Sequence, residues 1–457
     1  MANTLLLMSD EHNPFYTSLH GHPTVQTPNM ESLAQSGTWY ENTYCPSPLC
    51  LPCRSSFMSG KWVHEVQAYN NSNVNLPPDL PSWGSVLAQQ NIHTAFVGKV
   101  DVYNQPQNLG FCDMMVPGSR KLPGDTHQRR NPMAIRRGGA DRANGYGTRD
   151  IAGSNDLKVV EQAIDWLNNT APNLDTPWVL AVNISNPHFP HFVTQDLWDM
   201  YPDGGDLPAL GLECESAQHP YAQNLRDHFE VEQFGEEQIR GLRRGYLGCV
   251  TFVDRQIGRL LETLEQNNLR DDTNFIYTSD HGEMLGKFGM WWKCSLYEHS
   301  VRVPCIASGP DFQSDQTVTT PISLLDVQAT LFRSAQAERP GDWQGTPLQD
   351  IPSNDPQRPV FAEYHGHGNT ASTYMIRKGQ WKYIYYADGP DQLFDLDNDP
   401  EELNNIIDAN PTIASDLSTD LHSICDPQVE NDRAEAFINA QLETINQHPD
   451  WAEGTNG

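Results

Sequence analysis

The sequence has few basic residues for its length. Its 29 lysine and arginine residues face 59 aspartate and glutamate residues, which gives a formal net charge of −30. This excess of negative charge repels nucleic acids and anionic membrane surfaces at long range, so we expect neither as a partner. We interpret the excess as a surface adapted to salt. Each of the eight lysines is therefore noticeable wherever a motif could bind an anion.

The chain also lacks a long apolar run and a basic N-terminal region. No stretch approaches the ~20 consecutive apolar residues of a membrane-spanning helix. The apolar run at residues 4–8 is too short for a signal peptide, and no basic residue precedes it. We therefore expect a cytoplasmic protein without a membrane anchor, and a removed leader is the alternative.

Paired cysteine motifs are scarce as well. The nine cysteines are an odd number, and most are scattered along the chain, which argues against a disulfide framework. Only Cys45, Cys50 and Cys53 lie close together. A structural zinc site normally needs four ligands, and no second C-x-x-C occurs in the sequence. Two structural interpretations of this cluster stay open: Cys45, Cys50 and Cys53 as part of a zinc knuckle, or Cys50 and Cys53 as a redox pair.

The cysteine cluster opens a stretch, residues 45–62, that combines a proline-rich turn with a short serine-rich segment. Proline ahead of a helix and small polar residues at its start are typical of a helix beginning. We therefore expect Cys50 in the turn and Arg54 one helical turn later. The free N–H groups and the positive dipole end at such a place favour a tetrahedral oxyanion such as sulfate or phosphate.

Two apolar segments, residues 4–8 and 274–279, are predicted strands that both end in acidic residues. In an open α/β sheet, ligands bind at the carboxyl ends of the strands, so the two ends converge if the strands are neighbours. The predicted metal ligands are Asp10, Glu11, Asp280 and His281. Three carboxylates and one imidazole suit a hard divalent cation, with Ca²⁺ favoured and Mn²⁺ or Mg²⁺ as alternatives. A merely solvated strand end is the other interpretation of each acidic pair.

The spacing Cys50-x-Pro52-x-Arg54, followed by Ser59 and Gly60, resembles the signature of the type I sulfatases of the alkaline phosphatase superfamily. In that family the cysteine is oxidised to formylglycine, whose hydrated aldehyde is the nucleophile. The resemblance implies that Cys50 takes this role, that residue 50 is also a ligand of the metal, and that Arg54 holds the hydrate. It also implies a formylglycine-generating maturation enzyme as a partner.

Two of the few lysines, and one histidine, also lie in elements that resemble those of sulfatases. Lys99 lies in a Gly-Lys-x element and Lys293 in a Lys-x-x-x-Tyr-Glu element, as in sulfatases, which implies that both bind sulfate. His188 belongs to a His-x-Pro element after a predicted strand, which implies that it assists the leaving group, with His191 as the alternative. A lone histidine at a strand end is otherwise most often structural.

Two positions depart from the commoner family pattern. Asp101 stands where a histidine is expected, and this form resembles the arylsulfatase K branch, whose members are uronate 2-sulfatases. Residues two apart at a strand end point the same way, so we expect Asp101 to face the same pocket as Lys99 and to accept the proton when sulfate is released. A surface acid is the alternative. Glu11 replaces an Asp or Gln, and the Asp280-His281 pair resembles choline sulfatases and phosphonate monoester hydrolases.

The length of 457 residues allows one large α/β domain and a smaller one. We expect a catalytic domain at residues 1–355, built on a large, mainly parallel sheet sandwiched by helices. Residues 356–457 are expected to form a C-terminal subdomain, because 374–386 and 392–396 have a strand–turn–strand pattern that resembles the small antiparallel sheet of sulfatases. A polar helix is predicted at 432–446, where a contact in a homo-oligomer is one option.

The predicted activity is hydrolysis of a sulfate ester. The substrate is a saccharide, including a sulfated uronate, or another small organic sulfate. A phosphonate monoester or phosphate diester hydrolase with the same site is the alternative, and a non-catalytic anion-binding relative is a third interpretation. Candidate substrate contacts are Asn71, His365 and His367, for which a plain loop and a surface His-Gly-His are the alternatives.

Overall fold

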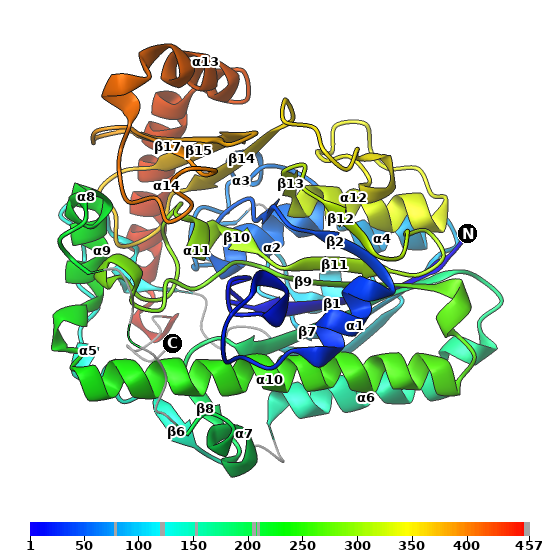
Figure 1. The fold of residues 1–457 in the computed structure, drawn as a ribbon. Coiled ribbons are helices and arrows are strands. Elements are labelled where there is room, and N and C mark those ends of the chain that lie inside the picture. The colour runs from blue at the N-terminus through cyan, green and yellow to red at the C-terminus, as the bar shows by residue number, and fades with distance from the viewer. Residues whose placement is uncertain (77–79, 119–123, 151–153, 203–206, 208–210, 452–457) are drawn as a thin grey trace.

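The computed structural model of the chain describes residues 1–76, 80–118, 124–150, 154–202, 207 and 211–451. An eight-stranded sheet runs through its centre in the order β12-β2-β11-β9-β1-β7-β4-β5 (Figure 1). The consecutive parallel strands are β9 (Thr273–Ser279), β1 (Asn3–Asp10), β7 (Trp178–Pro187), β4 (His93–Lys99) and β5 (Asp113–Gly118). The antiparallel exception is β11 (Cys305–Ser308), which separates β9 from β2 (Gly37–Tyr40) and β12 (Gln316–Val318). The expectation of a mainly parallel sheet is confirmed.

Strand β1 lies in the interior of this sheet, and its side chains are apolar on both faces. Leu6 and Met8 pack into the core on one side, and Leu5 and Leu7 pack into the core on the other. All four are buried. A strand that is covered on both faces reads as a continuous apolar run rather than as an alternating one. This pattern made β1 predictable from the sequence.

Helices cover both faces of the sheet (Figure 1). One layer contains α1 (Pro28–Gln35), α6 (Asn155–Asn169) and α10 (Glu236–Gln266), whose apolar stripes share a core with Leu5. The other face is covered by α2 (Cys50–Ser59), α4 (Trp83–Ala88) and α12 (Leu324–Ala335), which share a core with Leu6. Among the described helices, none is both long and apolar enough to cross a membrane.

Short elements fill the space around these layers. A three-stranded sheet contains β10 (Arg302–Val303), β3 (Thr43–Tyr44) and β13 (Ile322–Ser323), and a parallel pair contains β6 (Tyr146–Thr148) and β8 (His191–Val193). The short helices are α3 (Val63–Val66), α5 (Gly139–Ala143), α7 (Gln195–Asp199), α8 (Glu215–Gln218), α9 (Pro220–Phe229) and α11 (Glu298–Val301).

A separate antiparallel sheet follows near the end of the chain. Its strands, in order, are β14 (Pro359–Tyr364), β15 (Thr373–Lys378), β16 (Trp381–Tyr386) and β17 (Gln392–Asp395). Helix α13 (Pro411–His422) packs on it in a small core of its own, and α14 (Pro427–Gln447) follows. The expected small antiparallel sheet is therefore present, while the division at residue 355 stays a prediction.

A buried ion-pair network joins the small sheet to the main body. Lys382 on β16 places its Nζ 2.9 Å from Glu298 Oε1 and 2.7 Å from Glu402 Oε1, and all three side chains are buried. Burial raises the pKa of Glu298, but the charges of Lys382, Arg377 and Arg302 outweigh burial and lower it to about 2. Each partner in this network is needed to compensate the charge of another.

We expect the substitution Lys382→Met to lower the free energy of unfolding by about 3–5 kcal/mol, because it leaves two buried carboxylates without their shared cation. The control is Lys378→Met, which removes a partly exposed pair in which Lys378 Nζ lies 3.0 Å from Asp420 Oδ2. Its cost should stay below about 1 kcal/mol. Guanidinium titration of both variants gives the comparison, and equal losses would contradict the role of the network.

Candidate active site

The carboxyl ends of β1 and β9 build the centre of the site. The two strands are parallel neighbours, with Ser9 paired to Ser279 in register. Asp10 and Asp280 therefore lie at the same edge of the sheet, and the backbone N–H of Glu11 donates to Asp280 Oδ1 at 3.2 Å. The convergence expected from two strands with similar endings is present in the structure.

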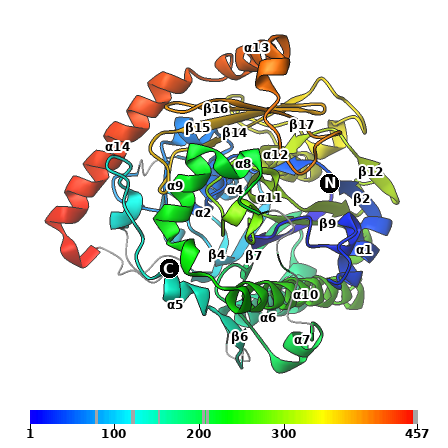
Figure 2. The ribbon, with the colours of Figure 1, turned by 60° about the vertical axis from the view of Figure 1, so that its left-hand side comes forward.

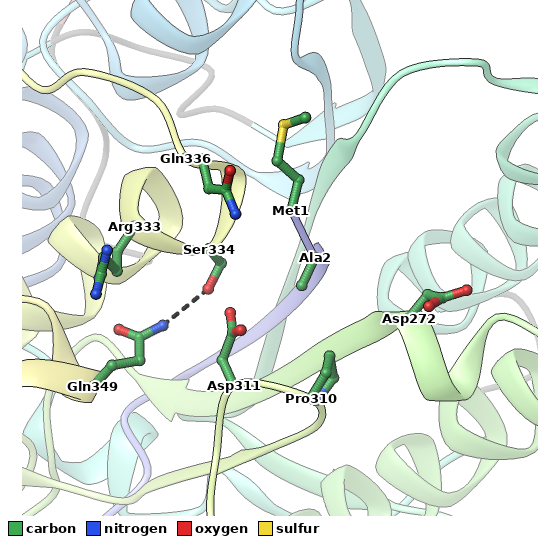
Figure 3. A pocket seen from close by; sticks show the side chains of 9 residues that line it. All are labelled: Met1, Ala2, Asp272, Pro310, Asp311, Arg333, Ser334, Gln336 and Gln349. Atoms are coloured by element: carbon green, nitrogen blue, oxygen red, sulfur yellow. Dashed lines mark hydrogen bonds between the residues drawn. The ribbon is translucent and has the colours of Figure 1, made fainter.

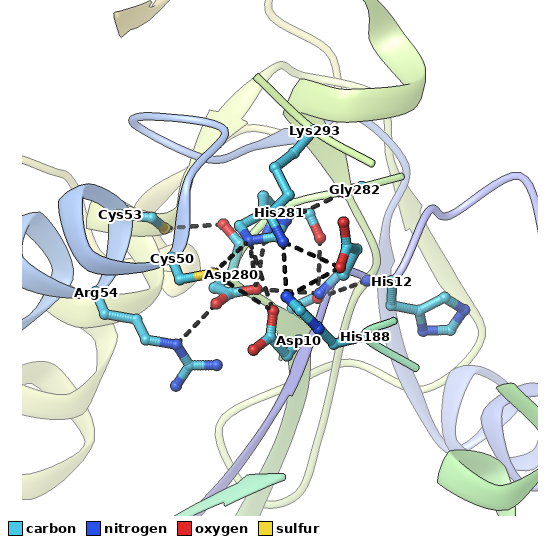
Figure 4. A network of polar contacts seen from close by, with 12 residues as sticks. Asp10, His12, Cys50, Cys53, Arg54, His188, Asp280, His281, Gly282 and Lys293 are labelled. Atoms are coloured by element: carbon cyan, nitrogen blue, oxygen red, sulfur yellow. Dashed lines mark hydrogen bonds and ion pairs between the residues drawn. The ribbon is translucent and has the colours of Figure 1, made fainter. Parts of the chain in front are cut away.

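Four buried side chains meet at this edge (Figure 4). Asp10, Cys50, Asp280 and His281 each offer one ligand atom, and these atoms all lie within 4.8 Å of one another. The Sγ of Cys50 is 3.3 Å from His281 Nε2 and 4.0 Å from Asp10 Oδ1. A second group with the same spacing contains Asp10, Glu11 and His188. Oxygen and imidazole ligands packed this closely fit a hard divalent cation.

Helix α2 brings Cys50 to the cluster. The helix begins at Cys50 itself, after Leu49 in an extended conformation, and ends at Ser59, before Gly60, which has a φ of 67°. Cys50 is thus the first helical residue and not a turn residue. All ten residues of the helix are buried, so packing on every side fixes the position of Cys50. The backbone N–H of Leu51 donates to Asn71 Oδ1 at 3.0 Å.

Arg54 lies one turn further along α2 and reaches back to the cluster. Its Nε donates to Asp280 Oδ2 at 2.7 Å, and its Nη1 donates to Asn183 Oδ1 at 3.0 Å. Asn183 belongs to β7 and is buried. Sequence reasoning missed this residue, although an asparagine inside an otherwise apolar strand was a usable signal. Two acceptors from two strands therefore fix the guanidinium group.

Two lysines and a histidine lie around the cluster of candidate metal ligands. Lys99 pairs with Asp10, and its Nζ is also 3.4 Å from Asp101 Oδ2. Lys293 Nζ lies 3.1 Å from Glu11 Oε2 and 2.7 Å from His188 Nε2. The side chains of Lys99, His188 and Lys293 keep 15%, 23% and 10% of their surface accessible, whereas Asp10 and His281 keep none. The basic groups therefore face the open side of the cluster.

Burial and close charges shift the pKa values in opposite directions. Burial raises the pKa of Asp10, but Lys99, His188 and Arg54 outweigh it and hold this pKa well below its usual value. For Asp280, burial outweighs the charge of Arg54, and the pKa is raised. Burial lowers the pKa of His281, yet the negative charges beside it raise the pKa to about 9. The site thus concentrates negative charge that a cation would neutralise.

Burial and nearby charges also shift the pKa of the Cys50 thiol in opposite directions. Burial raises its pKa, but the positive charges of Lys293 and Lys99 are stronger, so the pKa lies well below its usual value. By contrast, burial raises the pKa of Cys53, whose Sγ contacts the carbonyl oxygen of Asp280 at 2.8 Å. The two cysteines of the C-x-x-C pair therefore have different environments, and only Cys50 faces the basic groups.

The three candidate substrate contacts are buried. His365 lies 2.8 Å from Glu363 Oε2 through Nε2 and 2.8 Å from Ser372 Oγ through Nδ1. His367 Nδ1 is 3.3 Å from Gln128 Oε1. Within the described part of the chain, neither histidine nor Asn71 hydrogen-bonds to a metal-ligand candidate. The motif is not a surface His-Gly-His, and a role in substrate binding stays a prediction.

Two other residues near the site have structural contacts. His191, the alternative to His188, has its Nδ1 3.0 Å from the carbonyl oxygen of Leu242, and burial lowers its pKa to about 4. Glu283, which sequence reasoning missed, accepts the backbone N–H of Leu285 at 2.9 Å and that of Trp292 at 2.5 Å. It thereby anchors the loop that carries Lys293.

A separate cavity lies at the opposite edge of the sheet, beside the amino ends of β1 and β9 (Figure 3). Its lining residues are Met1, Ala2, Asp272, Pro310, Asp311, Arg333, Ser334, Gln336 and Gln349. In open α/β sheets, ligands bind at the carboxyl ends of the strands. This cavity is therefore not part of the candidate site.

Family models match most of the chain. The model described as Sulfatase matches residues 2–337, and one described as N-sulphoglucosamine sulphohydrolase, C-terminal, matches residues 286–426. The chain belongs to the sulfatase family, and its enzyme class is that of the sulfuric ester hydrolases.

Individual relatives agree with this assignment. The choline-sulfatase of Rhizobium meliloti (strain 1021) is 30% identical over 443 residues, which cover 91% of this chain and 84% of that protein. Arylsulfatase K of Danio rerio is 29% identical over 453 residues, with 93% and 84% covered. Both branches suggested by the sequence motifs are therefore represented.

Solved structures share the fold at lower sequence identity. A protein in complex with its substrate D-glucosamine-2-N,6-O-disulfate has a TM-score of 0.77 at 21% identity, with 95% of this chain and 99% of that chain covered. The phosphonate monoester hydrolase of Agrobacterium radiobacter has a TM-score of 0.75 at 22% identity, with 93% and 95% covered.

We expect Asp280→Ala to abolish stoichiometric binding of a divalent cation, because it removes a carboxylate that faces both Asp10 and His281. The control is Asp254→Asn, a change to a buried acid that instead accepts backbone N–H groups from Asn29 and Met30 of α1. Elemental analysis of both purified variants measures the metal content. Unchanged metal in Asp280→Ala would show that the cluster is not a metal site.

Proposed function

We propose that the protein hydrolyses sulfate esters through a formylglycine formed from Cys50, with one divalent cation at the cluster. The observation that carries this proposal is the position of Cys50. It is the first residue of a buried helix, its Sγ lies 3.3 Å from His281 Nε2, and the lysines facing it lower its pKa. In the structure the thiol sulfur marks the place that an oxygen of the aldehyde hydrate would take.

The ligands that would hold the cation are Asp10, Asp280, His281 and Glu11, beside residue 50. Their oxygen-rich set supports Ca²⁺, with Mn²⁺ or Mg²⁺ as alternatives. A bound cation would supply positive charge that favours the ionised form of a hydroxyl on residue 50. Arg54 has the complementary task of orienting that hydroxyl, because its guanidinium is already fixed by Asp280 and Asn183.

The basic groups on the open side would receive the sulfate group. Lys99 and Lys293 place two positive charges where negative charge develops on the oxygens of sulfur. His188 would donate a proton to the departing alcohol oxygen. Burial lowers the pKa of His188, but the charges of Glu11 and Asp10 and a hydrogen bond to Cys50 together outweigh it, so the pKa is raised. An upward shift favours the protonated imidazole that a general acid requires.

The second half of the reaction needs a base. Asp101 lies on the same side as Lys99, with 3.4 Å between its Oδ2 and Lys99 Nζ. We propose that Asp101 accepts the proton of the hydroxyl that remains on residue 50. The loss of this proton expels sulfate and restores the aldehyde. The similarity to a choline-sulfatase and to arylsulfatase K supports an organic sulfate ester as the substrate. The two proposed classes are a sulfated saccharide, including a sulfated uronate, and another organic sulfate.

The test of this proposal is the mass of residue 50 together with turnover. We expect protein coproduced with a formylglycine-generating enzyme to contain a peptide lighter than its cysteine form, and to hydrolyse a sulfate ester. Cys50→Ala should lower turnover by on the order of 10⁴-fold or more. The control Cys249→Ala changes a buried cysteine of α10 and should stay active. An unmodified, inactive wild type would instead support a non-catalytic anion-binding protein.

The alternative function is hydrolysis of phosphonate monoesters or phosphate diesters. Phosphonate monoester hydrolases share the fold at TM-scores of 0.75 and 0.74. Such substrates carry one negative charge on a tetrahedral group, as sulfate monoesters do, so the basic site accommodates either. Turnover of a 4-nitrophenyl sulfate and a 4-nitrophenyl phosphonate, with the same leaving group, separates them. A higher kcat/KM for the phosphonate would favour the alternative.

We expect Asp101→Asn to accumulate sulfated enzyme, because the amide keeps the shape of the side chain but not its basicity. The backbone φ of Asp101 is 38°, a left-handed conformation that asparagine tolerates. The variant should release a burst of alcohol and then turn over slowly. The control is Asp113→Asn, which removes a carboxylate paired with His93 on the neighbouring strand. Intact-mass spectrometry after a short incubation detects the adduct, and normal turnover without one would exclude Asp101 from catalysis.

A further inference from the structure

Helix α14 lies outside both matched family models. The C-terminal model ends at residue 426, and α14 begins at Pro427. Figure 2 shows the helix, in red, along the outside of the molecule. Its buried residues after the first turn are Ala434, Ile438, Gln441 and Ile445, whose spacing marks one face. Gln441 is the polar member of this otherwise apolar stripe, at 1% exposure.

A buried amide is costly unless its hydrogen bonds are made. Gln441 makes them with one short segment, residues 70–74. Its Oε1 accepts from Asn70 Nδ2 at 2.9 Å, and its Nε2 donates to the carbonyl oxygens of Ser72 at 3.3 Å and Val74 at 2.7 Å. Both N–H groups of the amide are therefore used. The partners are buried as well, so water does not readily replace Gln441.

Other contacts hold the same helix against the region before this segment. Arg433 Nε donates to Tyr69 Oη at 3.0 Å, and its Nη2 donates to the carbonyl oxygen of His64. Ala434 shares a small core with Val63 and Tyr69. Asn70 itself also accepts the backbone N–H of Ser72 at 2.9 Å. The segment is thus fixed from α14 at both its start and its end.

The fixed segment carries Asn71, whose Oδ1 accepts the backbone N–H of Leu51 at 3.0 Å. Leu51 follows Cys50 in the first turn of α2. A continuous set of buried hydrogen bonds therefore leads from Gln441 through residues 70–74 to the residue next to the nucleophile position. A shift of about 1 Å at reacting atoms costs up to ~10²-fold in rate.

We propose that Gln441 is a positioning residue for catalysis. It acts through Asn71, which sets the position of residue 50 relative to Asp10 and His281. This inference rests on the proposed role of Cys50 as the nucleophile. It gives α14 a function in the reaction in addition to its packing. The part of Gln441 that matters is its amide, because the neighbours on the stripe already supply apolar packing.

The test compares Gln441→Met, Asn71→Ala and the double variant at a temperature where all remain folded. Methionine keeps the volume and the apolar face but removes the three hydrogen bonds. We expect each single variant to lower kcat by about 10- to 100-fold with little change in KM. The double variant should be no slower than Asn71→Ala, because both act through one path. Asn439→Ala, an exposed change on the same helix, is the control and should leave kcat unchanged.

Hydrogen–deuterium exchange supplies a readout besides activity. In Gln441→Met, peptides covering residues 70–75 and the first turn of α2 should exchange faster, while α13 should not change. Wild-type kcat in Gln441→Met, effects that multiply in the double variant, or unchanged exchange at Leu51 would each overturn the proposal. An inactive wild type would contradict the proposed function instead, and the exchange measurement would still test the path from Gln441 to Leu51.

Discussion

The repulsion between carboxylates brought together by two parallel strands is the constraint on which the site depends. β1 and β9 are paired in register, so Asp10 and Asp280 end at the same buried edge. Two buried negative charges are unfavourable unless cations compensate them. Arg54 and Lys99 supply part of this compensation from α2 and β4. The positions of those two elements are therefore part of the same electrostatic arrangement.

Much of this arrangement follows from local sequence patterns. Apolar runs that end in acids predicted β1 and β9, and α10 repeats apolar residues at helical spacing. Such patterns succeed because a buried strand or an amphipathic helix repeats one simple rule over many residues. The sulfatase resemblance then assigned Cys50, Arg54, Lys99 and Lys293, all of which lie at one site in the structure.

Other features could not be read from the chain because they depend on distant partners. Asn183 stands out as a polar residue in an apolar strand, but only the approach of Arg54 shows what it binds, and only the Trp292 backbone does so for Glu283. His365 is a predicted substrate contact, and only the structure shows that its two ring nitrogens lie 2.8 Å from Ser372 Oγ and Glu363 Oε2. Likewise, Gln441 is one of many glutamines until α14 is placed against residues 70–74. Tertiary contacts between residues far apart in sequence leave little local signal.

The burial of Cys50 has a consequence for the order of events during synthesis. At 1% exposure, residue 50 is out of reach of another protein once α2 is packed. The formylglycine proposed at this position would therefore have to be made on a chain that is still open. Among the described helices, α14, which packs against residues 70–74, is the last long one to be made, and most of the chain separates it from Cys50. At ribosomal speed this interval lasts about 20–80 s, which is the time that the proposed maturation would have before α14 docks.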